Sequence, residues 1–179
     1  MLSQKPHKWN KIIQAFENDQ TGELLAVQRT GSRGRIFLKL VNEILDKLQI
    51  GHESEPVFDH KQPNSWYQDF AAKHKIKLKV HSYYNPDFLL EDGTWLEVTL
   101  SENTAYKKLM RYGHQAPKLM IIWLDEDDGL HKQVCQNRRF PQARITSIKH
   151  FYPQLNSDKE GMKIINDLER LKNFKGILL

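Results

Sequence analysis

The sequence contains a single cysteine, Cys135, among its 179 residues. One thiol cannot form an intramolecular disulfide bond, and it excludes a zinc site built from several cysteines. No apolar run approaches the ~20 residues that a membrane-spanning helix needs. The first residues, MLSQKPHKWNK, are charged and lack the apolar core of a secretory signal. We therefore expect a reduced, cytoplasmic protein that does not enter a membrane.

Several catalytic motifs are also missing from the sequence. It has no P-loop, no GxGxxG loop and no GxSxG elbow, so a nucleotide-driven motor or a serine hydrolase finds no support. The charge balance is more informative: 27 Lys and Arg against 22 Asp and Glu give a net charge of +5 and a pI near 9.2. This moderate excess suits a polyanionic partner such as DNA or RNA, although many basic proteins bind no nucleic acid.

Apolar periodicity indicates alternating helices and strands along the chain. A short helix is expected at Trp9–Phe16, and the clearest helix covers residues 32–51, where Gly51 supplies a stop. We expect a short helix over residues 64–74 and a strand over 75–83. The chain divides into an N-terminal extension, residues 1–33, and a single α/β domain, residues 34–179.

The second half of the chain predicts the centre of the fold. Two apolar runs flank Asp92-Gly93, which is typical of a β-hairpin. A helix over 103–115, a buried strand over 117–125, a strand over 143–152 and a C-terminal helix after a capping box at Ser157 follow. The inner face of that last helix is expected to hold Met162, Ile165, Leu168 and Leu171. This order predicts a central mixed β-sheet flanked by helices.

Two acids in the hairpin, Asp87 and Glu97, are the main candidates for chemistry. Glu97 lies between apolar neighbours on a strand, where a bare charge is costly unless a cation compensates it. A two-residue turn would place the acids on opposite faces, whereas a three-residue turn, Glu91-Asp92-Gly93, places Asp87 directly across from Glu97. The alternative is an ordinary hairpin in which Asp87 caps a strand and Glu97 pairs with a lysine.

The stretch NPDFLLEDGTWLEVT, with an amphipathic helix before it and a helix and a buried strand after it, resembles the PD-(D/E)XK nuclease superfamily. The likeness spans roughly residues 34–125 and implies a restriction-endonuclease-like core. It further implies a Mg²⁺ ion, for which Mn²⁺ can substitute, held by Asp87, Glu97, the Val98 carbonyl and a glutamate of the first core helix, here Glu43. A marginal helical glutamate such as Glu43 is equally well explained as a surface group.

The departure from the family pattern is Thr99, which stands where the motif has Lys. Either the cation has moved to the next helix or cleavage has been lost and binding kept. On that helix Lys108 lies at the margin of the inner stripe, and Lys107 points away. Lys108 is therefore the candidate for a displaced catalytic lysine, with a solvated basic face as the alternative.

Four further basic residues are candidates for phosphate contacts, which need only Lys or Arg near the nucleic-acid backbone: Arg33, Arg35, Lys107 and Arg111. Together these features predict a Mg²⁺-dependent endonuclease that hydrolyses nucleic acid, with DNA as the expected substrate and RNA as the alternative. The rival hypothesis is a nuclease-like module that binds nucleic acid or a partner protein without cutting. A third possibility is a small oligomerising subunit whose cleavage depends on a partner. Because no separate recognition domain is evident, a homodimer, a partner protein or surface loops would supply the specificity of a nuclease.

Overall fold

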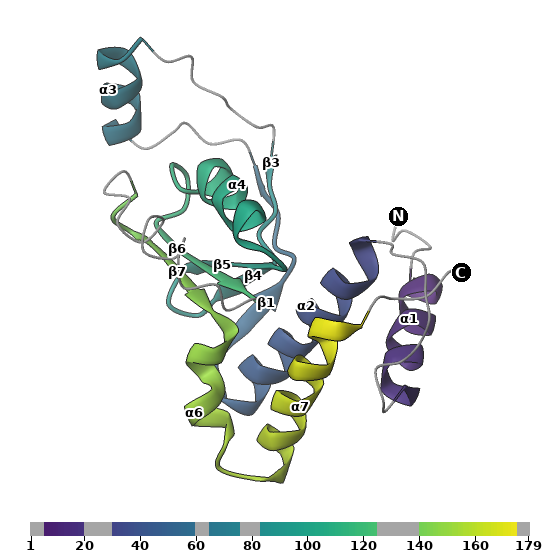
Figure 1. Cartoon of the computed structure of the whole chain (residues 1–179). Helices are drawn as coiled ribbons and strands as arrows, with labels where there is room; N and C mark the ends of the chain where they lie inside the picture. The colour runs from purple at the N-terminus through teal and green to yellow at the C-terminus, as the bar shows by residue number, and fades with distance from the viewer. Residues whose placement is uncertain (1–5, 20–29, 60–64, 76–82, 125–139, 175–179) are drawn as a thin grey trace.

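The computed structural model describes residues 6–19, 30–59, 65–75, 83–124 and 140–174 (Figure 1). Cys135 and most of the strand expected at 75–83 lie outside these residues. The helices are α1 Pro6–Asn18, α2 Thr30–Lys47, α3 Ser65–Lys73, α4 Glu102–Tyr112, η1 Ile148–Phe151 (a 3-10 helix), α6 Tyr152–Leu155 and α7 Lys159–Asn173. The strands are β1 His52–Ser54, β2 Phe58–Asp59, β3 Tyr83–Tyr84, β4 Phe88–Leu90, β5 Thr94–Thr99, β6 Lys118–Trp123 and β7 Ala143–Ser147.

Five of the strands form one mixed sheet in the order β1-β4-β5-β6-β7. The first three strands in this order pair antiparallel, and β5, β6 and β7 pair parallel. The strands β2 and β3 form a separate two-stranded sheet. The prediction of an α/β protein with a central mixed sheet flanked by helices is therefore confirmed.

Helices cover both faces of the five-stranded sheet (Figure 1). On one face α4 packs on β5 and β6, and on the other α2 packs on β5, with α7 and α1 packed against α2. Side chains of β5 alternate between the two layers, as a pleated strand requires. Leu96 and Val98 join the core under α2, whereas Trp95 joins the core under α4. Glu97 and Thr99 therefore face α4.

The hairpin between β4 and β5 has the turn that a shared acid site requires. Phe88 pairs with Leu96 and Leu89 with Trp95, so the register leaves three turn residues and sets Asp87 opposite Glu97. Gly93 has a φ of +82°, a left-handed backbone that glycine adopts without strain. Its amide donates a hydrogen bond of 2.9 Å to the Leu90 carbonyl oxygen. The prediction of a three-residue turn is confirmed.

The N-terminal helix shares the core of the main domain. Ile12 and Phe16 of α1 lie in one buried cluster with side chains of α2 and α7. The boundary that we expected between residues 33 and 34 falls within α2. None of the described helices has the length and apolarity to cross a membrane.

Two expectations for the C-terminal third are wrong in detail. The strand expected over 143–152 ends at Ser147, whose side chain accepts a hydrogen bond from the Lys149 amide and starts η1. The capping residue of α7 is Asp158, which accepts from the Gly161 amide at 2.9 Å. Gly161 packs against the Leu155 carbonyl group, where a Cβ would not fit, so this residue belongs to the inner face of α7. The buried residues are Gly161, Ile164, Leu168 and Leu171, while Met162 is exposed.

Candidate active site

The two acids of the hairpin face the same layer of the protein. Asp87 precedes β4 and lies across from Glu97, and its Oδ2 accepts a hydrogen bond of 2.7 Å from the Val98 amide. That bond fixes the Asp87 carboxylate against β5. Asp87 is partly exposed, whereas Glu97 is only 1% exposed. The acids therefore form a site with Glu97 at its floor and Asp87 at its mouth.

Helix α4 brings a lysine into this site. The Lys108 Nζ lies 2.5 Å from Glu97 Oε2, 3.0 Å from Asp87 Oδ2 and 2.7 Å from the Val98 carbonyl oxygen. Its neighbour Lys107 is exposed. Lys108 reaches the acids because it follows Ala105 and precedes Leu109 and Tyr112, which anchor α4 in the core. Thr99 supplies no charge here, and its hydroxyl donates to the Ser101 carbonyl oxygen.

Burial and the neighbouring charges shift the pKa values of Glu97 and Lys108. Desolvation and the charge of Asp87 raise the pKa of Glu97 to about 7, and Lys108 opposes that rise. Burial alone would lower the pKa of Lys108, but the charges of Glu97 and Asp87 outweigh it and raise that pKa. Two carboxylates and one ammonium leave a formal charge of −1 when all three are ionised. A group of higher positive charge would suit these oxygens better.

Tyr112 and Asn85 belong to the site as well, and sequence reasoning missed both roles. The buried Tyr112 hydroxyl donates a hydrogen bond of 3.1 Å to the Asn85 carbonyl oxygen, and it lies close enough to Glu97 to lower the pKa of that acid. The Asn85 amide group donates to the carbonyl oxygens of Glu55 and Pro56. A buried tyrosine hydroxyl needs a partner, which was the available signal.

The oxygens of this site fit a hard divalent cation. Carboxylate oxygens of Asp87 and Glu97 and the Val98 carbonyl oxygen converge on the position of the Lys108 ammonium. Such oxygens are the ligands that Mg²⁺ and Mn²⁺ prefer. Glu97 Oε1 is also buried without a hydrogen-bond partner, and an unpaired buried oxygen is costly unless another group completes it. The residues present therefore fit the metal that the sequence implies.

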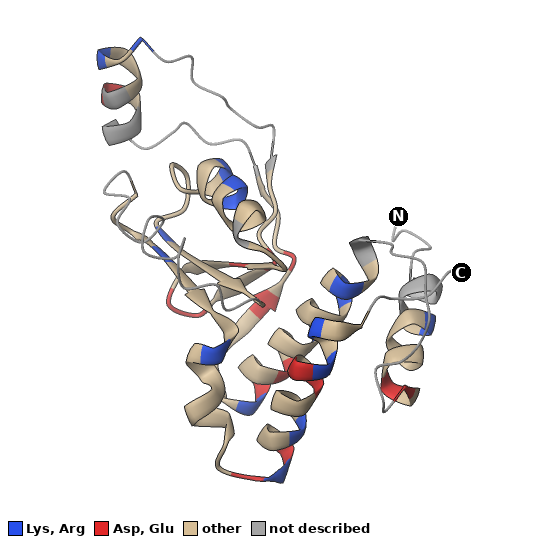
Figure 2. Cartoon of the chain, in the orientation of Figure 1, with Lys and Arg blue, Asp and Glu red and all other residues tan. Residues whose placement is uncertain are grey.

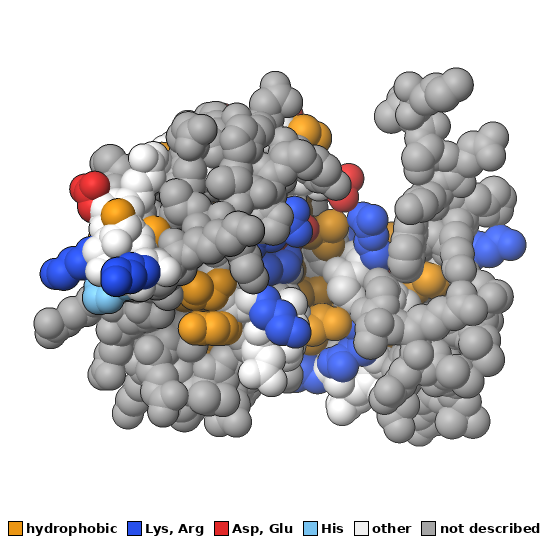
Figure 3. Space-filling view, turned by 90° about the horizontal axis from the view of Figure 1, so that it is seen from above, with side chains coloured by type: hydrophobic (Ala, Val, Ile, Leu, Met, Phe, Trp, Pro, Cys, Tyr) orange, Lys and Arg blue, Asp and Glu red, His pale blue; other side chains and the backbone are white. Residues whose placement is uncertain are grey.

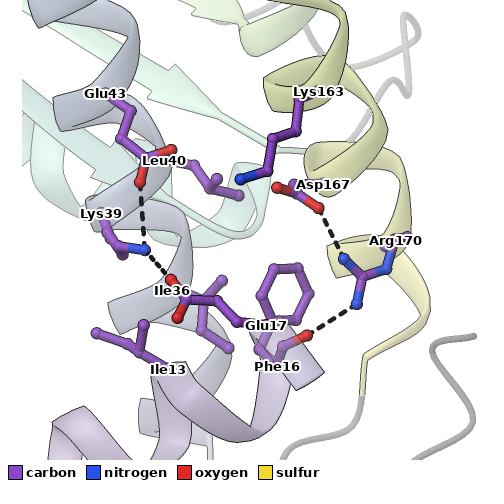
Figure 4. A pocket seen from close by; sticks show the side chains of 10 residues that line it. All are labelled: Ile13, Phe16, Glu17, Ile36, Lys39, Leu40, Glu43, Lys163, Asp167 and Arg170. Carbon is purple, nitrogen blue, oxygen red and sulfur yellow. Dashed lines mark hydrogen bonds and ion pairs between the residues drawn. The ribbon is translucent and has the colours of Figure 1, made fainter. Parts of the chain in front are cut away.

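Glu43 does not join the two acids. Asp87 and Glu97 face α4, whereas α2, which carries Glu43, covers the opposite face of the sheet. Glu43 instead pairs with Lys39 at 3.2 Å and lines a pocket between α1, α2 and α7 (Figure 4). Within the described ranges, no three side chains of the His, Cys, Asp and Glu types gather as one metal-binding group. A metal at this site would depend on two acids and a carbonyl oxygen.

The four basic residues expected at phosphates differ in their surroundings. Arg33 is engaged inside the fold, because it donates to the carbonyl oxygens of Leu171 and Lys172 at the end of α7. This contact accounts for Arg33 without nucleic acid.

The other three basic residues lie at the surface. Lys107 and Arg111 are exposed on α4, and Arg35 forms a partly exposed ion pair of 3.3 Å with Glu55. The Glu55 amide donates to the Asp87 carbonyl oxygen, which brings Arg35 towards the mouth of the site. Figure 2 shows Lys and Arg residues on α4 and along the length of α2 and α7, and several Lys and Arg side chains gather along the middle of the face seen in Figure 3.

We compared the chain with family models, curated proteins and solved structures. No family model, no curated protein and no solved structure matches the chain.

Proposed function

We propose that this protein is a metal-dependent endonuclease of the PD-(D/E)XK type that hydrolyses phosphodiester bonds of nucleic acid, with DNA as the first substrate to test. One observation carries the proposal. Asp87, Glu97, the Val98 carbonyl oxygen and Lys108 meet at one point, with contacts of 2.5–3.0 Å. These are the groups that such a nuclease needs, and Lys108 stands in for the motif lysine that Thr99 replaces.

The arrangement of elements supports a restriction-endonuclease-like core. An amphipathic helix, α2, is followed by the β4–β5 hairpin, by α4 and by the buried strand β6, which pairs parallel to β5. This is the order that the sequence resemblance implies. The hairpin carries both acids and α4 carries the lysine, so each required group comes from the element expected to provide it.

The residues divide the work between holding a metal and handling the phosphate. Asp87, Glu97 and the Val98 carbonyl oxygen would hold Mg²⁺ or Mn²⁺, which, when bound, polarises a phosphate and lowers the pKa of a water molecule. Lys108 offers a positive charge beside the reacting phosphate, where negative charge increases in the transition state. The hydrogen bond from the Tyr112 hydroxyl to the Asn85 carbonyl oxygen fixes the segment that leads through Asp87 into β4.

The substrate would approach over the outer side of α4. Lys107 and Arg111 are exposed there as neighbours on one helix face and can contact phosphates of the bound nucleic acid. Arg35 borders the mouth of the site from α2 through its ion pair with Glu55. Arg33 takes no part, because its guanidinium is bonded to the end of α7.

The test is cleavage of labelled DNA and RNA by the purified protein in Mg²⁺ or Mn²⁺, beside Asp87→Asn, Glu97→Gln and Lys108→Met. We expect the wild type to cut and each variant to lose at least a hundredfold in rate, since each lacks a group that contacts the metal or the phosphate. Glu53→Gln is the matched control, because Glu53 is an exposed acid on β1. Cleavage that survives Asp87→Asn unchanged would exclude this site as the catalytic centre.

The ion pairs of Lys108 also favour a second candidate function, which the same experiment tests. One ammonium already bonds to both acids, so Lys108 offsets one of their two negative charges without a metal. A nuclease-like module that binds nucleic acid or a partner protein without cutting would need no metal at these acids. Intact binding of nucleic acid by a folded wild type that cuts no substrate would favour this module.

A further inference from the structure

We propose that Lys108 and a divalent cation exclude one another, so that Lys108 leaves the acids whenever the cation binds. The proposal concerns the regulation of the same site and rests on the proposed function for its biological use. In the metal-free protein Lys108 acts as a latch, a word used here for its three contacts with Asp87, Glu97 and the Val98 carbonyl oxygen.

The geometry of the latch leaves no room for a second cation between the same oxygens. The Lys108 nitrogen bonds to Glu97 Oε2, Asp87 Oδ2 and the Val98 carbonyl oxygen over 2.5–3.0 Å. A Mg²⁺ ion needs its oxygens at about 2.0–2.1 Å, in near-octahedral geometry. An ion placed among these three oxygens would therefore lie against the ammonium group, at a distance where two cations repel strongly.

Charge balance favours the exchange once a divalent ion is available. With the latch closed, two carboxylates face one positive charge, and Glu97 Oε1 remains without a hydrogen-bond partner. A divalent ion in place of the ammonium brings the formal charge of the cluster from −1 to 0, and it offers a partner to the unpaired oxygen. The same exchange sets the Lys108 ammonium free.

The released side chain has a path to solvent. About a quarter of the Lys108 side chain is exposed, as is the same share of Asp87 at the mouth of the site. A lysine has four flexible methylene groups, so its ammonium can swing outwards while its stem stays packed. It would then point to the mouth, where a phosphate on the metal has to lie. The latch thus keeps the lysine away from the phosphate position until a metal is bound.

The first test measures Mn²⁺ affinity by calorimetry for the wild type, Lys108→Met and Lys107→Met. Methionine keeps the length of the stem and removes the charge, and Lys107 is the exposed neighbour on the same helix. We expect Lys108→Met to bind Mn²⁺ at least tenfold more tightly, which corresponds to about 1.4 kcal/mol. Lys107→Met should stay within about twofold of the wild type, because its charge lies outside the cluster. Equal affinities for Lys108→Met and the wild type overturn the proposal.

The second test needs no variant, which matters if Lys108→Met folds poorly with two uncompensated acids. Acetylation of the wild-type protein is followed at single lysines by mass spectrometry, with and without Mn²⁺. We expect Mn²⁺ to increase the labelling of Lys108 at least threefold and to leave Lys107 unchanged. A lysine that stays at the acids when the metal binds would show no increase, and that result overturns the latch.

The two tests separate the latch from the nuclease proposal. If the protein cuts DNA but Mn²⁺ does not change the labelling of Lys108, the latch is overturned and the nuclease proposal stands. Protein that cuts nothing but releases Lys108 on addition of Mn²⁺ supports the latch and overturns the nuclease. If neither the wild type nor Lys108→Met binds Mn²⁺, both proposals are overturned.

Discussion

At the scale of single residues, Glu97 should govern how stability of the metal-free protein depends on pH. Burial and the charge of Asp87 raise its pKa from 4.5 to about 7. Between these values the folded protein keeps a proton that the unfolded chain has released. The free energy of unfolding should therefore fall as the pH rises from about 4.5 to about 7, and this contribution should be constant at higher pH.

The effect can be isolated by urea unfolding in EDTA at pH 5 and pH 7.5 for the wild type, Glu97→Gln and Glu53→Gln. Glutamine cannot titrate, so Glu97→Gln should lose this part of the pH dependence, and Glu53→Gln should keep it because Glu53 is exposed. Groups that do not contact Glu97 contribute equally to all three proteins. An unchanged difference between the two pH values in Glu97→Gln would show that Glu97 is not the group responsible.

At the scale of elements, the turn of the β4–β5 hairpin holds the two acids in register. Gly93 has a φ of +82° and nothing lies within 4 Å of where a Cβ would be, so a side chain there meets conformational strain and not a clash. Gly93→Ala should lower the free energy of unfolding by about 1–2 kcal/mol. Gly93→Asn should cost less, because asparagine tolerates the left-handed region better. Urea unfolding measures both, and equal stability of all three proteins would contradict the assigned turn.

The hairpin and α4 show what a sequence alone can predict. The Asp92-Gly93 pair marks the turn, and alternation of apolar residues in β5 fixes which neighbours share a face with Glu97. The helical repeat then sets Lys108 apart from Lys107 before any coordinates are known. These signals are local, since each depends on residues only a few positions apart.

Features that depend on contacts between distant parts of the chain are harder to predict from the sequence. Local patterns do not show that α2 packs on the face of the sheet opposite Glu97, so they could not decide whether Glu43 is a metal ligand or a surface group. The contacts of Arg33 with the end of α7 join residues far apart in the chain and were equally hidden. Ser147 ends β7 by capping η1, although the apolar pattern continues beyond it. In each case the position of the residue is set by packing between elements, which the local sequence pattern does not reveal.

At the scale of the whole molecule, the distribution of positive charge should control binding of nucleic acid. Arg111 is exposed on α4, and Arg33 is bonded to carbonyl oxygens of α7. Arg111→Gln should weaken binding and reduce the slope of log K against log salt concentration by about 1. Arg33→Gln should leave that slope unchanged and lower stability instead. Fluorescence anisotropy over a salt series with a labelled oligonucleotide in EDTA measures both, and equal slopes for Arg111→Gln and the wild type would exclude Arg111 as a phosphate contact.

The hydrogen bonds and ion pairs around Lys108 all connect side chains and backbone groups between Asn85 and Tyr112, one uninterrupted stretch of chain. Few residues separate its two ends, so little loop entropy is lost when they meet. Closing this stretch costs less loop entropy than joining α1 to α7, which lie at opposite ends of the chain. The stretch is therefore expected to take shape before the outer helices dock.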